Sequence, residues 1–334
     1  MPTVLLIQFH LMQKHRYPHL HPKIIELHKD GKTPTEIARK LIEEKKVSGY
    51  ENTIRMYVTR VVSKVEQRKE QINTGAKILV VDIETAPILG YVWGLWNQNV
   101  GIEQIESDWF CITWAAKWLF DKKVYSAALT SKEALKQDDR RIIKQLWSML
   151  NEADLVIAHN GDSFDIPKVN TKFLMYGIKP PLPYQTIDTL KHIRKQFAFS
   201  SNKLDYVNHM LNLPRKQQHE GFPLWKKCYK GDAKAINKML SYNIQDVRIL
   251  EETYLKIRAW IKPHPNVGLF ILDEHASHCP SCGSTKLESE GDKYYTTANV
   301  YEVYRCNNCQ ATSRKRLSSV NIKQRRHLTL SIPK

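Results

Sequence analysis

The pattern of apolar and polar positions divides the chain into three sections. In the first, apolar residues over 37–42 recur at helical spacing, and Thr33-Pro34 before them is typical of an N-cap followed by proline at the first helical position. A shorter helix is predicted over 22–29, and an apolar stripe over 51–65 predicts a third helix. We therefore predict a small all-α domain over residues 1–74.

The second section, residues 75–265, alternates strands with helices. Short apolar runs rich in β-branched residues predict buried strands, and longer amphipathic runs predict helices. The predicted strands cover 77–84, 109–119, 123–129 and 155–159, and the predicted helices cover 131–152, 165–176 and 232–260, with shorter elements over 185–212. This order resembles that of a ribonuclease H-like mixed sheet with flanking helices, so we expect an α/β domain of that class.

The third section, residues 269–334, contains paired cysteines. Cys279-Pro-Ser-Cys282 and Cys306-Asn-Asn-Cys309 are separated by 23 residues, a spacing typical of one Zn²⁺ held by four thiolates. The section resembles a zinc ribbon, and a closed site of this kind would be structural. Disulfides in an exported protein are the alternative. Cys111 and Cys228 are interpreted as ordinary buried thiols.

The charge balance is strongly basic. Lys and Arg number 51 against 34 Asp and Glu, a net charge of +17, and no acidic residue follows Val303. This balance favours a polyanionic partner such as nucleic acid. No run approaches the ~18 apolar residues of a membrane span, and no cleavable signal begins the sequence, so we expect a cytoplasmic protein. A phage or bacterial source is compatible with this domain set but cannot be determined from the sequence.

Two acidic residues stand inside the first predicted strand. Asp82 and Glu84 are two positions apart, so period-2 alternation places both carboxylates on one face. Adjacent buried carboxylates repel each other and are costly to desolvate. They are explained if a divalent cation lies between them, and Mg²⁺ prefers such oxygen ligands.

Two more acidic motifs follow in order. Asp162 and Asp165 come directly after the predicted strand over 155–159, and each is a candidate ligand. Tyr242 and Asp246 are four residues apart on the long predicted helix, so the phenol and the carboxylate share one face.

These motifs together resemble those of the DEDD exonuclease superfamily, and in particular the exonuclease domain of family B DNA polymerases. Asp82-Ile-Glu84 matches the first motif, Asn160-Gly-Asp-Ser-Phe-Asp165 the second, and Tyr242-x3-Asp246 the third. The segment over 188–207 also resembles the stretch between the second and third motifs of these enzymes. The resemblance covers about 77–260.

The resemblance also selects between alternatives. The family pattern places the second ligand after the aromatic residue of its motif, which favours Asp165 over Asp162. The histidine variant needs His five residues before the last Asp, where this chain has Ser241. Tyr242 therefore resembles the key residue of the tyrosine variant, DEDDy.

The activity implied by the resemblance is 3′→5′ exonuclease cleavage of DNA by a two-metal mechanism. Asp82, Glu84, Asp165 and Asp246 would hold two Mg²⁺ or Mn²⁺ ions about 3.5–4 Å apart. One ion would activate water, and the other would stabilise the leaving 3′ oxygen. Tyr242 would orient the attacking water.

Further nucleic-acid contacts are less specific. Trp93 and Trp96 follow the first motif and are candidates for stacking on single-stranded bases, although packing against the sheet is the stronger expectation. The first section resembles a helix-turn-helix, with Arg55 and Arg60 on its recognition helix, and a plain helical interaction module is the alternative. In the basic tail, the candidates for phosphate contacts are Arg314 and Arg316, and a solvated tail is the alternative.

Three other functions are weighed against a DNA exonuclease. A ribonuclease would use the same chemistry, and nothing in the sequence is specific for the 2′-hydroxyl. A transposase also combines a ribonuclease H-like sheet with a helix-turn-helix, but would not need Tyr242-x3-Asp246. A DNA-binding regulator would not need four carboxylates. We expect a monomer, with any replication or repair partner unidentified.

Overall fold

The computed structural model describes residues 20–44, 46–47, 50–59, 61–62, 75–215, 220–271, 273 and 275–332. Internal contacts divide the chain into two compact units, Met1–Thr74 with Leu272–Glu274, and Gly75–Ile271 with His275–Lys334. The second unit contains all the predicted metal ligands.

The first unit is helical over most of its described residues. α2 (His21–Lys29) and α3 (Pro34–Glu43) are followed by a helical stretch over 51–59. Thr33 caps α3 as predicted, because its hydroxyl accepts from the Glu36 amide while the Glu36 carboxylate accepts from the Thr33 amide at 2.7 Å. The apolar core of this unit consists of Leu20, Ile24, Leu27, Ile37, Ala38, Leu41, Val47, Ile54, Val58, Val61 and Val62. The predicted end of the third helix lies outside the described residues.

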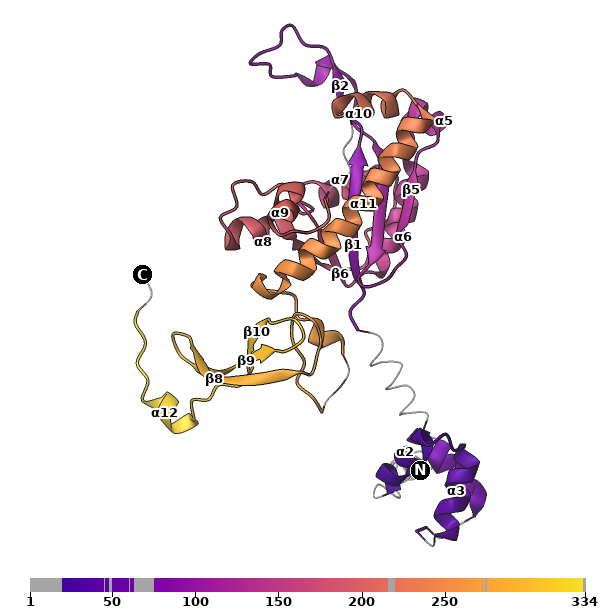
Figure 1. The fold of residues 1–334 in the computed structure, drawn as a ribbon, viewed down its shortest axis with the longest axis vertical. Helices are drawn as coiled ribbons and strands as arrows, with labels where there is room; N and C mark the ends of the chain where they lie inside the picture. Colours follow the sequence, from indigo (N-terminus) through magenta and orange to yellow (C-terminus); the bar gives the residue numbers. More distant parts are fainter. Residues whose placement is uncertain are drawn as a thin grey trace, which may run out of the picture. The chain divides into compact units, whose positions relative to one another are not determined.

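The second unit is built on a five-stranded mixed sheet, which confirms the predicted α/β class (Figure 1). In spatial order its strands are β5 (Tyr125–Ala128), β4 (Cys111–Trp118), β1 (Ile78–Thr85), β6 (Leu155–Ala158) and β7 (Gln185–Asp188). The central strand β1 pairs antiparallel with β4 and parallel with β6. β7 pairs parallel with β6 and is a strand that the sequence pattern did not predict.

Side chains along β1 alternate between two apolar cores. Leu79, Val81 and Ile83 belong to one core, and Val80 belongs to the other. Asp82 and Glu84 share the Val80 face, because alternate residues of a strand point the same way. The long helix α11 (Ala233–Ile257) packs against β1 and β4 and brings its own side chains toward this sheet (Figure 1).

The other helices lie near their predicted positions, with one correction. The single helix predicted over 131–152 is wrong: the structure has α5 (Ser131–Lys136) and α6 (Arg140–Glu152), because Gln137 adopts a left-handed conformation with φ of 55°. This break places Asp139, fully buried, just before α6. Further helices are α7 (Asp165–Met175), α8 (Thr189–Gln196), α9 (Leu204–Met210) and α10 (Phe222–Tyr229), and a short 3-10 helix, η4 (Arg258–Trp260), follows α11.

A small antiparallel sheet forms the cysteine-rich section. Its strands, in the order β10-β9-β8, are β8 (Leu287–Tyr295), β9 (Val300–Cys306) and β10 (Thr312–Arg314), with η5 (Val267–Phe270) before them and α12 (Ile322–Arg326) after them. The four predicted zinc ligands cluster in its small core together with Ala311. Within the described residues, we find no helix with the length and apolar character needed to cross a membrane.

Candidate active site

Three of the four predicted carboxylates lie at one place. Asp82 and Glu84 come from β1, and Asp246 comes from the middle of α11. Each contributes an oxygen to a group in which all these atoms lie within 4.8 Å of one another. Carboxylates this close repel one another unless a cation offsets their charge, and oxygen ligands suit Mg²⁺ or Mn²⁺. The donor set therefore fits a divalent metal ion.

Asn243 supports this cluster and was missed by the sequence analysis. Its side-chain amide donates a short hydrogen bond to Asp82 Oδ2, and its Oδ1 lies 3.3 Å from Thr113 Oγ1, which donates to it. Both Asn243 and Thr113 are completely buried. The amide therefore fixes the orientation of the Asp82 carboxylate, as groups behind metal ligands commonly do. Its position three residues before Asp246 on α11 is the only sequence signal that could have indicated it.

Asp165 lies beside the cluster, at the first residue of α7. Its Oδ1 accepts a hydrogen bond of 3.1 Å from the Ile83 amide, which places the carboxylate next to the β1 backbone between the two β1 ligands. Burial raises the pKa of the Asp165 carboxyl to about 7, and the negative charge of Asp188 contributes to the rise. A bound cation would offset this preference for the neutral form.

Asp188, at the end of β7, holds the loop that carries the second motif. Its carboxylate accepts from the amides of Asn160 at 3.0 Å and Asp162 at 3.3 Å, and it also caps α8. Asn160 has a φ of 72°, so the loop contains a residue that needs such support. Asp162 pairs with Lys191 at 2.8 Å on the surface side of this loop. That pairing is consistent with the choice of Asp165 as the ligand.

Tyr242 and Asp82 line the same cleft, which has a volume of about 770 Å³. Tyr242 is 8% exposed and stands one helical turn before Asp246 on α11. Arg194 and Lys203 line the cleft as well, and they supply positive charge near the carboxylates. The cleft therefore combines the carboxylate of Asp82, a phenol hydroxyl and cations, which is a surface suited to phosphate esters.

A buried network around Asp139, the residue before α6, connects α7 with β4. Asp139 Oδ2 lies 3.3 Å from Lys172 Nζ and accepts from the Cys111 amide at 2.7 Å. The Tyr176 hydroxyl donates a short hydrogen bond to the other oxygen, Oδ1. Because α7 begins at Asp165, this network holds the helix that presents the fourth predicted carboxylate. The network was not predicted, because residues 131–152 were expected to form one continuous helix.

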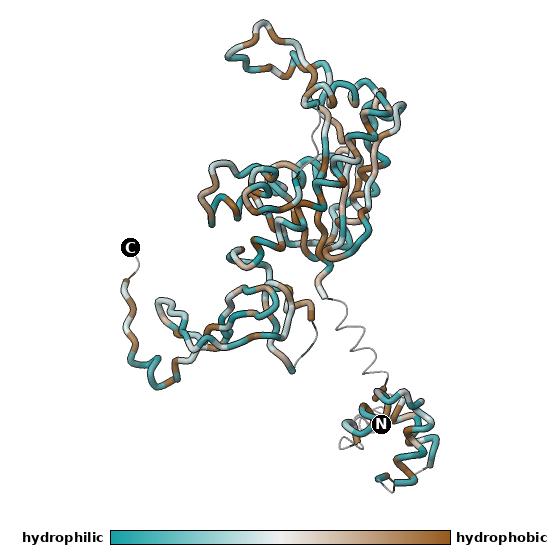
Figure 2. Tube along the Cα trace, viewed as in Figure 1, coloured by the Kyte–Doolittle hydropathy of each residue, from teal (hydrophilic) through white to brown (hydrophobic). Residues whose placement is uncertain are grey.

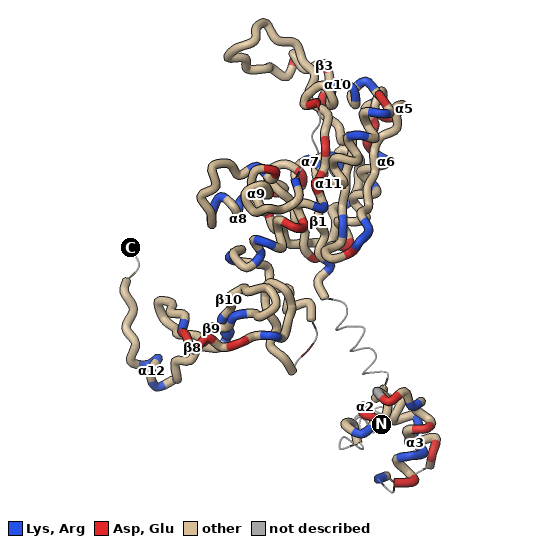
Figure 3. Tube along the Cα trace, in the orientation of Figure 1, with Lys and Arg blue, Asp and Glu red and all other residues tan. Residues whose placement is uncertain are grey.

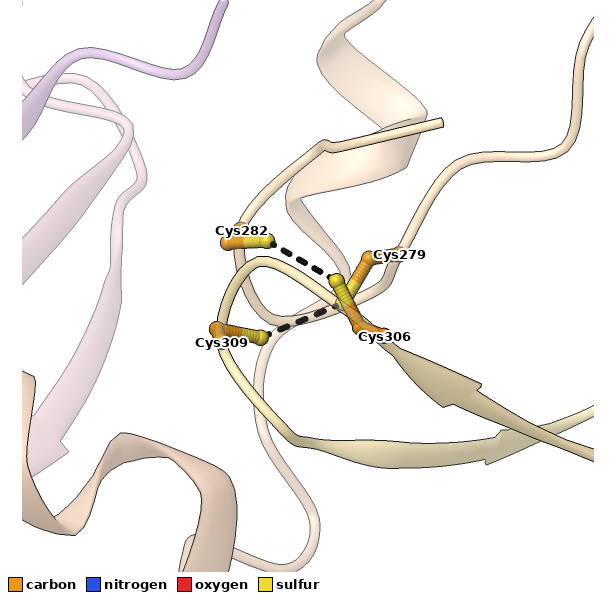
Figure 4. Close-up of side chains that lie close together, drawn as sticks. All are labelled: Cys279, Cys282, Cys306 and Cys309. Carbon is orange, nitrogen blue, oxygen red and sulfur yellow. Dashed lines mark hydrogen bonds between the residues drawn. The ribbon is translucent and has the colours of Figure 1, made fainter. Parts of the chain in front are cut away.

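The four predicted zinc ligands converge in the small sheet (Figure 4). Cys279 Sγ lies 3.6 Å from Cys309 Sγ, and Cys282 Sγ lies 3.6 Å from Cys306 Sγ. Sulfurs bound to one Zn²⁺ at about 2.3 Å would be about 3.8 Å apart, whereas disulfide sulfurs are about 2.05 Å apart. All six cysteines are free thiols in this structure. The sulfur set therefore fits tetrahedral zinc.

The loop after the first motif corrects one expectation. Trp93 and Trp96 were expected to pack against the sheet, but they are 96% and 83% exposed. They lie in a hairpin between β2 (Leu89–Gly90) and β3 (Ile105–Ser107), where Figure 2 shows several hydrophobic segments. The hairpin also contains the short helix η3 (Ile102–Gln104).

The structure describes three of the four basic residues that were predicted to contact nucleic acid. Arg55 is exposed on the helical stretch of the first unit. Arg60 lies outside the described residues. Arg314 and Arg316 are exposed at and after β10 in the second unit. Their contacts with nucleic acid stay predictions.

Comparisons with known proteins bear on the central domain. A family model described as the RNase H superfamily matches residues 117–258. A search of curated proteins finds no significant match. Among solved structures, the family B DNA polymerase from the hyperthermophilic archaeon Pyrobaculum calidifontis matches with 15% identity and a TM-score of 0.42, over 59% of this chain and only 26% of the polymerase chain. The mixed sheet and the family match together support a nuclease. Residues 117–258 are thus similar to the RNase H superfamily.

Proposed function

We propose that this protein is a metal-dependent 3′→5′ exonuclease that hydrolyses DNA. The observation that carries the proposal is the cleft shared by Asp82 and Tyr242, next to which Glu84 and Asp246 complete a carboxylate cluster. A non-enzymatic regulator has no use for such a cluster, because its mutual repulsion lowers stability unless cations are bound.

Each protein group has a distinct task in this proposal. Asp82, Glu84 and Asp246, with Asp165 alongside, hold divalent cations near the scissile phosphate. Such cations, when bound, supply a water of lowered pKa and positive charge that stabilises the leaving 3′ oxygen. The Tyr242 hydroxyl orients the attacking water by hydrogen bonding.

Two cations of the cleft have a role in substrate binding. Arg194 and Lys203 line the same cleft as Asp82, so they attract the phosphate backbone toward the carboxylates. The bond that forms joins the water oxygen to phosphorus, and the bond that breaks joins phosphorus to the 3′ oxygen. The product is a nucleoside 5′-monophosphate.

The polarity of cleavage is tested with single-stranded DNA labelled at its 5′ end, in the presence of Mg²⁺. We expect a ladder that shortens stepwise from the 3′ end, and a block when the 3′-terminal linkage is a phosphorothioate. Internal fragments, or early loss of the 5′ label, would contradict an exonuclease of this polarity. An RNA strand of the same sequence is assayed in parallel. If RNA is degraded faster than DNA, RNA and not DNA is the preferred substrate.

A further inference from the structure

The edge strand of the zinc-binding sheet ends in a run of cations. The order β10-β9-β8 leaves β10 at the edge, and its last residue, Arg314, is followed by Lys315 and Arg316. Figure 3 shows basic residues beside β10. Neighbouring cations on this sheet are neutralised: Arg305 pairs with Glu290, and Lys315 pairs with Glu302 at 2.8 Å. Among the described residues, no carboxylate forms an ion pair with Arg314.

Arg314 is held against two tyrosines on one face of the sheet. Tyr294 is the direct partner of Tyr301 in the register, and Arg314 is the direct partner of Val303, so all four side chains share a face. The Arg314 guanidinium carbon lies 3.8 Å from the centre of the Tyr301 ring and 6.0 Å from that of Tyr294. Arg314 Nη1 donates to the Lys315 carbonyl at 3.1 Å. The stacking and this bond orient the guanidinium while leaving its other N–H groups available to a ligand.

A small pocket brings a second cation to the same place. It has a volume of about 260 Å³ and is lined by Lys262, Tyr294, Val303, Thr312, Ser313 and Arg314. No carboxylate lines it, and within the described part of the chain Lys262 likewise forms no ion pair. Tyr294 is half exposed, so its ring is accessible beside the two cations.

We propose that this pocket, lined by Lys262, Tyr294 and Arg314, is a second nucleic-acid-binding site, separate from the carboxylate cluster, and that it binds single strands. Two uncompensated cations bind phosphates, and an accessible tyrosine ring stacks on a base. An acidic peptide could pair with the two cations, but its carboxylates would not stack on the Tyr294 ring. The choice of DNA as the ligand rests on the proposed function. Binding at this pocket does not require that the protein cleaves DNA.

Binding is measured by fluorescence anisotropy of labelled oligothymidylate with the full-length, zinc-loaded Asp82→Asn protein, which serves as the non-cleaving parent. Arg314→Ala and Lys262→Ala should each weaken binding about tenfold. Each should also reduce the slope of log affinity against log salt by about 0.7. Tyr294→Ala should weaken binding several-fold, while Tyr294→Phe keeps the ring and should bind like the parent.

Lys286→Ala is the matched control, because it removes an exposed cation from the same section outside the pocket. Zinc content verifies that each ribbon variant is folded, and Lys262→Ala changes a residue outside the ribbon strands. Parental affinity for Arg314→Ala and Lys262→Ala would overturn the proposal, as would equal weakening by Lys286→Ala. Oligoglutamate that competes as well as oligothymidylate of equal charge would also overturn it.

Hydrolysis of a small ester tests the exonuclease activity independently of the second binding site. The p-nitrophenyl ester of thymidine 5′-monophosphate needs only the carboxylate cluster. In a chain with native Asp82, Arg314→Ala should therefore hydrolyse the ester at the same rate as the unsubstituted protein. Absence of hydrolysis by every variant would contradict the exonuclease, whereas the anisotropy series would still test the second site.

Discussion

The side-chain amide of Asn243 donates a hydrogen bond to the carboxylate of Asp82, which lies 161 positions earlier in the chain. This bond joins α11 to the central strand at the point where the carboxylates cluster. It orients one predicted metal ligand and occupies one of its oxygens, so the geometry of the cluster depends on a residue that binds no metal itself.

We therefore expect Asn243→Ala to weaken Mg²⁺ binding or activity by about 10–100-fold, the usual cost of losing a group behind a metal ligand. The check is the Mg²⁺ dependence of cleavage, together with the rise in Tm on adding Mg²⁺. Asn237→Ala, an exposed change on the same helix, is the control. An unchanged Mg²⁺ requirement in Asn243→Ala would show that the hydrogen bond has no role in the site.

Tyr242→Phe removes only the hydroxyl from the cleft. We expect kcat to fall by about 100-fold with little change in KM, because the hydroxyl acts on the attacking water rather than on substrate binding. Tyr125→Phe makes the same chemical change on strand β5, away from the cleft, and should have no effect. A rise in KM at constant kcat would instead assign the hydroxyl to substrate binding.

Lys172→Met should lower the free energy of unfolding by about 3–5 kcal/mol, since it leaves Asp139 buried without its cation. Urea unfolding measures this change. Lys191→Met removes the surface partner of Asp162, where the lysine side chain is 57% exposed, and should lower the free energy of unfolding far less, because solvent screens the pair. Equal costs for the two variants would contradict the role assigned to the buried pair.

One zinc ion per chain is expected in the purified protein, and none in Cys306→Ser, because the site needs four thiolates. Cys228→Ser, which changes a buried thiol outside the cluster, should keep the zinc. Elemental analysis by mass spectrometry gives the stoichiometry. Disulfides between these cysteines in the purified protein would contradict the assignment.

The carboxylate cluster was predicted partly from local geometry and partly from the resemblance of its motifs. Asp82 and Glu84 share a face through strand alternation, and the position of Asp246 followed from the resemblance of its motif. The cluster of four cysteines was predicted from spacing as well, since each pair lies in a short knuckle.

Long-range contacts explain what the sequence did not predict. β7 has only four residues, two of them exposed, so its strand character comes from pairing with β6 rather than from an apolar run. The break at Gln137 and the burial of Asp139 depend on partners in β4 and α7. Trp93 was expected to be buried because it is apolar, but exposure depends on how the hairpin leaves the sheet.

Cleavage of 5′-labelled single-stranded DNA as a function of added Mg²⁺ tests the central claim most directly. The unsubstituted protein should show no 3′-end shortening in metal-free buffer and full activity once Mg²⁺ is restored. Asp82→Asn should lose this activity with its zinc intact, while Asp121→Asn, an exposed change in the β4–β5 turn, should keep it. Activity without added metal, or an active Asp82→Asn protein, would contradict the account.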